Sequence, residues 1–369
     1  MRYGYVGRIQ STIVRSKYFL QGVVLVSSSL APLILSASTA TASATFTNYP
    51  TTSSYTSPGQ VTTAGGSLWY VESTSSAPND YIGNMTTSGT VTDYNISYPT
   101  GTTKFTITSL TTGPDGNVWF DGCADTTGGL YAGFLNISTG AVTFYGNTHA
   151  SCNLGRSPGA IAAGSDGYVW YVDDNYEAPG DTGYIFSVNP STGATSTGYK
   201  TGVNWVPSGL TTGPDGRLWY TLPANNAVYA KTVSSGALTG GNVYFAHTLS
   251  SSPMNIISGP DGNLWFLEQG VTPKQIAKVT TSGSVSEYTL ASGVYPGALA
   301  AGSDGAVWFV DGGTTRKLGR ITGSGSVTEY TVPGTSVGNV NGLALGPDNA
   351  LWFTYGDSGG PKVGRLGYF

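Results

Sequence analysis

The sequence predicts an all-β fold, a seven-bladed β-propeller with four antiparallel strands in each blade. Three observations favour it. Only 10% of the 369 residues are charged, 54 residues are glycine and 12% are aromatic, a composition typical of short strands joined by tight turns. One motif, Gly-x-Asp-Gly-x-(Val/Leu)-Trp-(Phe/Tyr), recurs along the chain. Successive copies lie 43 to 51 residues apart, which is the period of propeller blades.

Seven copies of this motif predict seven blades. The first copy lacks the turn, and in the last copy Asn349 replaces the second glycine. The tryptophans of the seven copies are Trp69, Trp119, Trp170, Trp219, Trp265, Trp308 and Trp352.

Each repeat contains four expected strands in a fixed order. A short run of small and aliphatic residues, such as 209–212, is predicted to form the innermost strand, where the blades crowd the axis. The Gly-Pro-Asp-Gly turn follows. The second strand carries the tryptophan and the next aromatic residue, whose rings we expect to pack between neighbouring blades. A third strand, such as 317–321, and an alternating fourth strand, such as 326–332, complete the blade.

The two ends of the repeat region predict how the ring closes. The last repeat ends with its third strand, at residues 362–369, so its fourth strand is missing. Residues 44–50 match the pattern of the fourth strand at 327–333. We therefore expect the N-terminal strand of the mature chain to complete the last blade, which removes exposed sheet edges.

Residues 1–44 read as a secretory signal peptide. They hold four basic residues and no acidic residue, then an interrupted apolar stretch, and they end in Ala42-Ser43-Ala44. A membrane anchor is the alternative. Cleavage after Ala44 would leave a propeller domain at 45–369 with 12 basic and 20 acidic residues. Such an acidic protein is not expected to bind nucleic acid. We expect a secreted, extracytoplasmic monomer that does not contact the membrane after cleavage.

Cys123 and Cys152 are the two cysteines of the chain, and we expect them to form a disulfide. An exported protein meets an oxidising environment, in which a pair of cysteines usually bonds. A metal site would need more ligands than two thiols. A nucleophilic cysteine is the other alternative, with His149 close by in the sequence.

The repeated Gly-Pro-Asp-Gly-x-Leu-Trp-Phe, the Lys-x-Gly-Arg-Ile of the third strand and the Val-Thr-Glu-Tyr-Thr of the fourth resemble streptogramin lyases, also called virginiamycin B lyases. The resemblance covers residues 45–369. It implies a seven-bladed propeller and a carbon–oxygen lyase that opens a cyclic depsipeptide (streptogramin B) ester by elimination. It also implies histidine and glutamate side chains that work with Mg²⁺ on one face of the ring.

The candidate site residues lie at one mouth of the expected channel. Four of the seven positions three residues after a motif tryptophan are carboxylates, namely Glu72, Asp173, Glu268 and Asp311. They form either a ring of ligand or metal contacts or a solvated acidic rim. Trp205 lies in a connection between blades, where it either stacks on a ligand or caps its own blade.

The sequence leaves two functions open. The first is an exported binding propeller that takes a small-molecule, peptide or glycan ligand at one mouth and requires no cofactor. The second is an active lyase, with His247 and Glu268 as catalytic residues and Glu268 and Asp311 holding Mg²⁺. The Glu-x-His pair of the lyases is absent from this chain. A general base must lie within hydrogen-bond reach of its proton, so we expect weak or no lyase activity.

Overall fold

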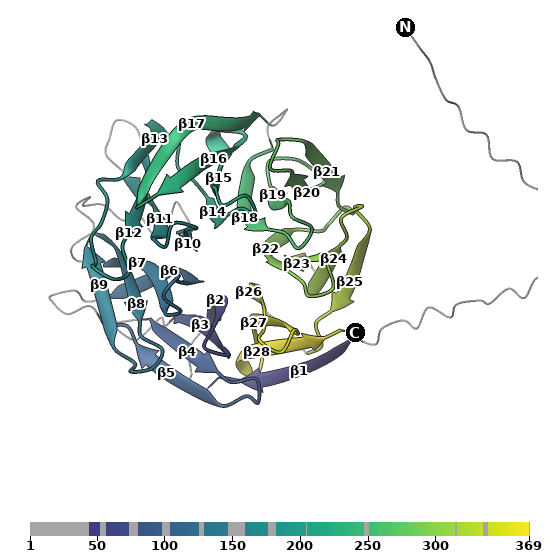
Figure 1. Ribbon diagram of the computed structural model, residues 1–369. Coiled ribbons are helices and arrows are strands. Elements are labelled where there is room, and N and C mark those ends of the chain that lie inside the picture. Colours follow the sequence, from purple (N-terminus) through teal and green to yellow (C-terminus); the bar gives the residue numbers. More distant parts are fainter. Residues whose placement is uncertain are drawn as a thin grey trace, which may run out of the picture. The chain divides into compact units, whose positions relative to one another are not determined.

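The computed structural model describes residues 44–51, 57–73, 80–97, 104–124, 129–146, 159–175, 182–203, 205–246, 251–313, 316–334 and 339–368. These residues form seven four-stranded antiparallel sheets arranged around one axis (Figure 1). The predicted seven-bladed propeller is therefore confirmed. The one helix among the described residues is a short 3₁₀ turn, Pro223–Asn225, and no helix there is long and apolar enough to span a membrane.

The first four blades follow one another along the chain. Blade 1 consists of β2 (Ser57–Ala64), β3 (Ser67–Ser73), β4 (Tyr81–Met85) and β5 (Val91–Asn95). Blade 2 consists of β6 (Phe105–Thr112), β7 (Val118–Ala124), β8 (Leu130–Leu135) and β9 (Val142–Gly146). Blade 3 consists of β10 (Ile161–Ala163), β11 (Val169–Asn175), β12 (Thr182–Val188) and β13 (Tyr199–Val203). Blade 4 consists of β14 (Gly209–Thr212), β15 (Leu218–Leu222), β16 (Ala227–Ser234) and β17 (Ala237–Ala246).

The last three blades repeat this order until the chain ends. Blade 5 consists of β18 (Pro253–Ser258), β19 (Leu264–Glu268), β20 (Gln275–Val279) and β21 (Val285–Thr289). Blade 6 consists of β22 (Pro296–Ala301), β23 (Val307–Asp311), β24 (Lys317–Ile321) and β25 (Val327–Thr331). Blade 7 consists of β26 (Val340–Leu345), β27 (Leu351–Asp357) and β28 (Gly360–Gly367), with β1 (Thr45–Pro50) as its outer strand.

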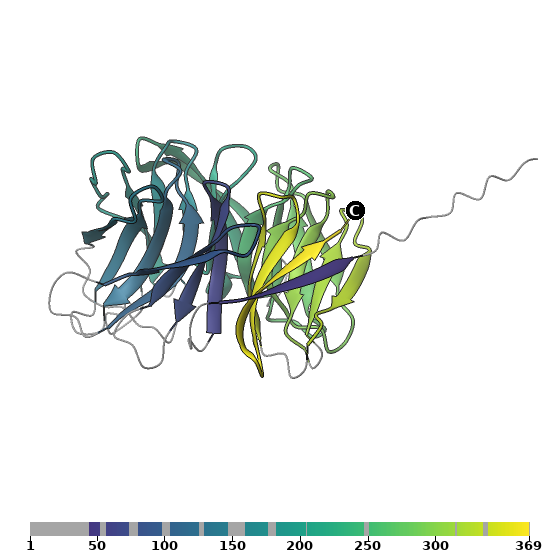
Figure 2. The ribbon, with the colours of Figure 1, turned by 90° about the horizontal axis from the view of Figure 1, so that it is seen from below.

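The outer strand of blade 7 comes from the other end of the propeller domain. Strand β1 pairs antiparallel with β28, with Thr45 opposite Gly367 and Pro50 opposite Lys362. Figure 2 shows β1 alongside the C-terminal strands. This is the closure expected from the sequence, and the backbone hydrogen bonds of β28 are thereby used on both sides.

The aspartate of each turn binds the tryptophan of the same motif. In the six copies that have the turn, the carboxylate accepts the indole N–H four residues later at 2.9–3.2 Å. In the first copy, which lacks the turn, the carbonyl of Ala64 accepts the N–H of Trp69 at 3.0 Å. The motif therefore supplies a buried indole together with its acceptor, a role that sequence analysis had not assigned to the aspartate.

The motif rings join each blade to the next, as expected. Trp119 of blade 2, for example, lies in one buried cluster with Val169 and Tyr171 of blade 3. The third strand leaves room for the neighbouring aromatic ring. A Cβ at Gly319 would lie 2.0 Å from Cζ of Phe309, so the Lys-x-Gly-Arg-Ile pattern requires its glycine for packing.

Candidate functional site

The predicted carboxylates lie at one mouth of the channel, because in each blade the end of the second strand lies beside the start of the first strand. Glu72 lies opposite Pro58, Glu268 opposite Pro253, and Asp311 opposite Pro296. The carboxylate positions thus meet the inner strands at the same face of the ring, as the sequence predicted.

The solvated acidic rim, one of the two alternatives from the sequence, is wrong. The exposed fractions of Glu72, Asp173, Glu268 and Asp311 are 1%, 2%, 0% and 3%. Both faces of a blade pack against its neighbours, so a residue near the end of a second strand stays between blades instead of reaching solvent. A buried carboxyl group must either accept hydrogen bonds or hold a proton, so these positions are expected to fix nearby backbone or to have raised pKa values.

Asp311 uses its carboxylate to hold the loop beside it. Its Oδ1 accepts the backbone N–H groups of Tyr295 and Gly313, each at 2.9 Å. The carbonyl of Tyr295 in turn accepts the N–H of Gly312 at 2.9 Å. These bonds fix the backbone of Tyr295, whose side chain is 56% exposed at the rim of the mouth. Sequence analysis missed Tyr295; its signal was an aromatic residue directly before the inner strand.

Two buried carboxyl groups near this mouth have raised pKa values. Burial raises the pKa of Glu268 to about 7, and the negative charge of Glu287 adds to the shift. Burial also raises the pKa of Asp121 to about 6, although the hydroxyls of Ser109 and Thr108 each donate to its Oδ1 at 2.6 Å. The other oxygen of Asp121, Oδ2, is buried and has no hydrogen-bond partner within the described structure.

Glu268 and Asp311 do not fit the magnesium site that the resemblance implied. Mg²⁺ prefers ionised oxygen ligands that can share an octahedral shell with several waters. Glu268 is fully buried, away from the waters that such a shell needs, and Asp311 already accepts two backbone N–H groups. Within the described ranges, no three or more histidine, cysteine or carboxylate side chains are grouped to hold a metal ion.

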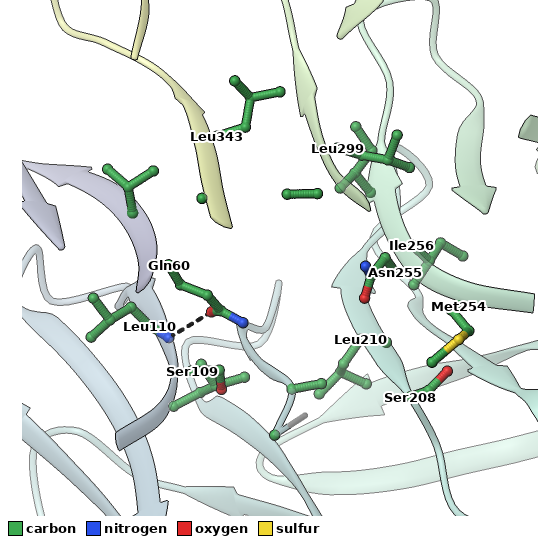
Figure 3. Close-up of a pocket in the computed structure, with 18 of the residues that line it drawn as sticks. Gln60, Ser109, Leu110, Ser208, Leu210, Met254, Asn255, Ile256, Leu299 and Leu343 are labelled. Carbon is green, nitrogen blue, oxygen red and sulfur yellow. Dashed lines mark hydrogen bonds between the residues drawn. The ribbon is translucent and has the colours of Figure 1, made fainter. Parts of the chain in front are cut away.

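A cavity of about 360 Å³ occupies the channel on the side of this mouth (Figure 3). All seven blades contribute to it, through their inner strands or the residues just before them, and no lining residue is charged. Both hydroxyl groups that line the cavity already form hydrogen bonds with the wall. Ser109 donates to Asp121, and Ser208 donates to the carbonyl of Pro253 at 3.2 Å. The cavity therefore presents mainly aliphatic and amide groups.

Trp205 lies in the connection between blades 3 and 4 and packs against buried residues of blade 4. It is half-buried against the cluster that contains Leu222 and Tyr229. A Cβ at Gly202 would lie 2.9 Å from its ring. This packing agrees with the capping role, and the role of Trp205 in stacking on a ligand stays a prediction.

Two further predictions depend on residues outside the described part of the chain. His247 lies there, so the catalytic pair of His247 and Glu268 stays a prediction. Cys152 also lies there, and the predicted disulfide with Cys123, a buried residue of β7, stays a prediction. The expected signal peptide, apart from Ala44, likewise lies outside the described residues.

Comparisons with known proteins agree with the resemblance read from the motifs. The sequence profile of the virginiamycin B lyase family matches residues 191–368. A streptogramin B lyase structure is similar at 23% identity over 88% of this chain and 98% of its own, with a TM-score of 0.66. A catalytically inactive histidine-to-alanine variant of virginiamycin B lyase from Staphylococcus aureus, with quinupristin, is similar at 25% identity over 88% and 99%, with a TM-score of 0.67.

A more distant structure shares the fold alone. Oligogalacturonate lyase from Vibrio parahaemolyticus is 11% identical over 89% of this chain and 98% of its own, with a TM-score of 0.56. No curated protein matches the chain. The chain therefore resembles virginiamycin B lyases in sequence motifs and in its seven-bladed fold.

Proposed function

We propose that this protein is an exported ligand-binding propeller of the virginiamycin B lyase type, and that it binds an uncharged group at the mouth described above. The cavity carries this proposal. Its volume of about 360 Å³ falls within the range of about 300–1,000 Å³ typical of ligand pockets. The nearby carboxylates are buried in the wall, and Asp311 is committed to backbone N–H groups.

The exposed ring of Tyr295 supports the same mouth as a binding surface. Its backbone is fixed by Asp311 and Gly312, so the ring is presented at little further cost in backbone entropy. An exposed aromatic ring can cover the apolar face of a peptide or a sugar.

Quinupristin is the probe for the first test, with binding measured by isothermal titration calorimetry. We expect Ala298→Trp, which places a large ring in the cavity wall, to weaken binding at least about tenfold. The matched control is Ala141→Trp, at an exposed position before β9. We expect Tyr295→Ala to weaken binding about threefold to tenfold. Equal affinity in the wild type, Ala298→Trp and Tyr295→Ala would show that this mouth is not the binding site.

A carbon–oxygen lyase is the second candidate, and the state of Glu268 favours it. A carboxyl group with a pKa of about 7 is well matched to general-base catalysis near neutral pH. We still expect weak or no turnover, because the Glu-x-His pair is absent from the sequence. Chromatographic separation of the cyclic ester from its linear dehydro product measures the reaction. Robust wild-type turnover that is lost in both Glu268→Gln and His247→Ala would overturn our preference for binding.

Export is a separate part of the proposal. N-terminal sequencing of secreted material should begin at Thr45, after Ala42-Ser43-Ala44. Retention of the intact N-terminus in the membrane would contradict export and place the protein in the anchored class.

A further inference from the structure

We propose that Gln60 and Asn255 form a recognition pair inside the channel, which selects uncharged chemical groups that present a carbonyl oxygen beside an aliphatic body. The inference rests on the proposed function, that a ligand enters this mouth, and it names the chemical class of that ligand. The two residues come from blades 1 and 5, and their amides face the cavity in Figure 3.

The orientation of the Gln60 amide is set by the neighbouring blade. Its Oε1 accepts the backbone N–H of Leu110 in β6 at 3.1 Å. An amide whose oxygen is fixed in this way must direct its nitrogen elsewhere, and here the nitrogen faces the cavity (Figure 3). Within the described structure, Nε2 of Gln60 makes no hydrogen bond. The side chain therefore offers a positioned N–H donor to a ligand.

Asn255 is held toward the cavity by its backbone. Its φ of +48° lies in the left-handed region, at a break in the register between Met254 and Ile257. Blade 4 approaches closely at this point, because a Cβ at Gly209 would lie 3.0 Å from the backbone nitrogen of Asn255. The amide of Asn255 makes no hydrogen bond to any described residue. A non-glycine residue in this conformation that also lines a cavity is a candidate for a binding role.

The rest of the cavity wall determines which ligands would be favoured. The side chains around the two amides include Leu110, Leu210, Leu299, Leu343 and Met254. A charged group would lose its hydration here without meeting a counter-ion among the lining residues, which makes its entry costly. A neutral carbonyl needs only the donors that Gln60 and Asn255 supply. Lactams, esters and peptide groups with aliphatic neighbours meet these requirements.

Small cyclic probes of equal ring size test the pair directly. The neutral lactam 2-pyrrolidinone presents a carbonyl oxygen, whereas pyrrolidine is a cation at neutral pH. Crystals of the protein are soaked in each probe, and affinities are measured by ligand-observed NMR. We expect the lactam in the cavity, with its oxygen within hydrogen-bond distance of Gln60 Nε2 or of the Asn255 amide. Equal occupancy by the two probes, or a cavity that takes neither, would overturn the inference.

Two variants separate recognition from folding. Asn255→Gly keeps a backbone that tolerates positive φ, so it should fold with unchanged or higher Tm and yet bind the lactam about tenfold more weakly. Gln60→Glu retains the bond from Leu110 N–H but places a carboxylate oxygen toward the cavity, so it should reverse the preference in favour of pyrrolidine. Lactam affinity unchanged in Asn255→Gly, or a preference unchanged in Gln60→Glu, would refute the pair.

Matched controls lie far from the cavity. Gln275→Glu makes the same substitution in β20, where the side chain bonds Thr289. Asn349→Gly makes the same substitution as Asn255→Gly at an exposed asparagine that also has positive φ, 60°, in the turn of blade 7. Neither should alter lactam binding. Quinupristin binding that is insensitive to Gln60 and Asn255 would refute the pair and leave the proposed function standing. Binding of the lactam without binding of quinupristin would leave the pair standing and would contradict quinupristin as a ligand of this mouth.

Discussion

Replacing Asp121 with asparagine should remove a large part of the pH dependence of stability. The carboxyl group is fully buried, and burial raises its pKa from 3.8 to about 6. The folded protein therefore holds this proton more tightly than the unfolded chain does. The resulting stabilisation is complete below about pH 3.8 and is lost as the pH rises through about 6.

The size of the effect follows from that shift. Raising the pKa of Asp121 from 3.8 to about 6 corresponds to about 3 kcal/mol of unfolding free energy, because one pKa unit corresponds to 1.36 kcal/mol. Asparagine resembles the protonated acid in shape and carries no charge. The difference in unfolding free energy between wild type and Asp121→Asn should therefore change by about 3 kcal/mol between pH 3.5 and pH 8, in favour of the variant at pH 8.

Urea unfolding at a series of pH values, followed by tryptophan fluorescence, measures this difference. Any pH-independent cost of the amide cancels, because only the change with pH is compared. Ser109→Ala provides a second test, since it removes a hydroxyl that favours the charged form. Its stability should fall more steeply than that of the wild type between pH 4 and 7. A difference between wild type and Asp121→Asn that stays constant with pH would refute the reasoning.

Two further predictions concern packing and covalent structure. Gly319→Ala should cost about 1–3 kcal/mol of stability, because its Cβ would lie 2.0 Å from Phe309. The control Gly356→Ala in β27, whose Cβ would have no atom within 4 Å, should be neutral or gain about 0.5 kcal/mol. Equal stabilities of the two variants in urea unfolding would contradict this prediction. The Cys123–Cys152 disulfide should contribute roughly 3–4 kcal/mol, and two free thiols in the denatured, unreduced secreted protein would disprove it.

The sequence was sufficient to predict the architecture, because each blade is specified locally and seven times over. The 43- to 51-residue period indicated propeller blades, the seven copies of the motif predicted their number, and the pattern of residues 44–50 placed the closing strand β1 beside β28. Turn residues and aromatic positions act within a few residues of one another. Such short-range signals can be read without knowing which blades are neighbours.

The candidate site depended on contacts between distant segments, which the sequence alone does not reveal. Glu268 looked like a strand-end residue open to solvent, and only the packing of blades on both sides shows that it is buried. The donor of Gln60 faces the channel because its oxygen is bound by Leu110, 50 residues away. The left-handed backbone of Asn255 accompanies a close approach by Gly209 of the neighbouring blade. Strands and turns follow from local pattern, whereas burial, proton affinity and the cavity arise only where seven separate segments converge on one axis.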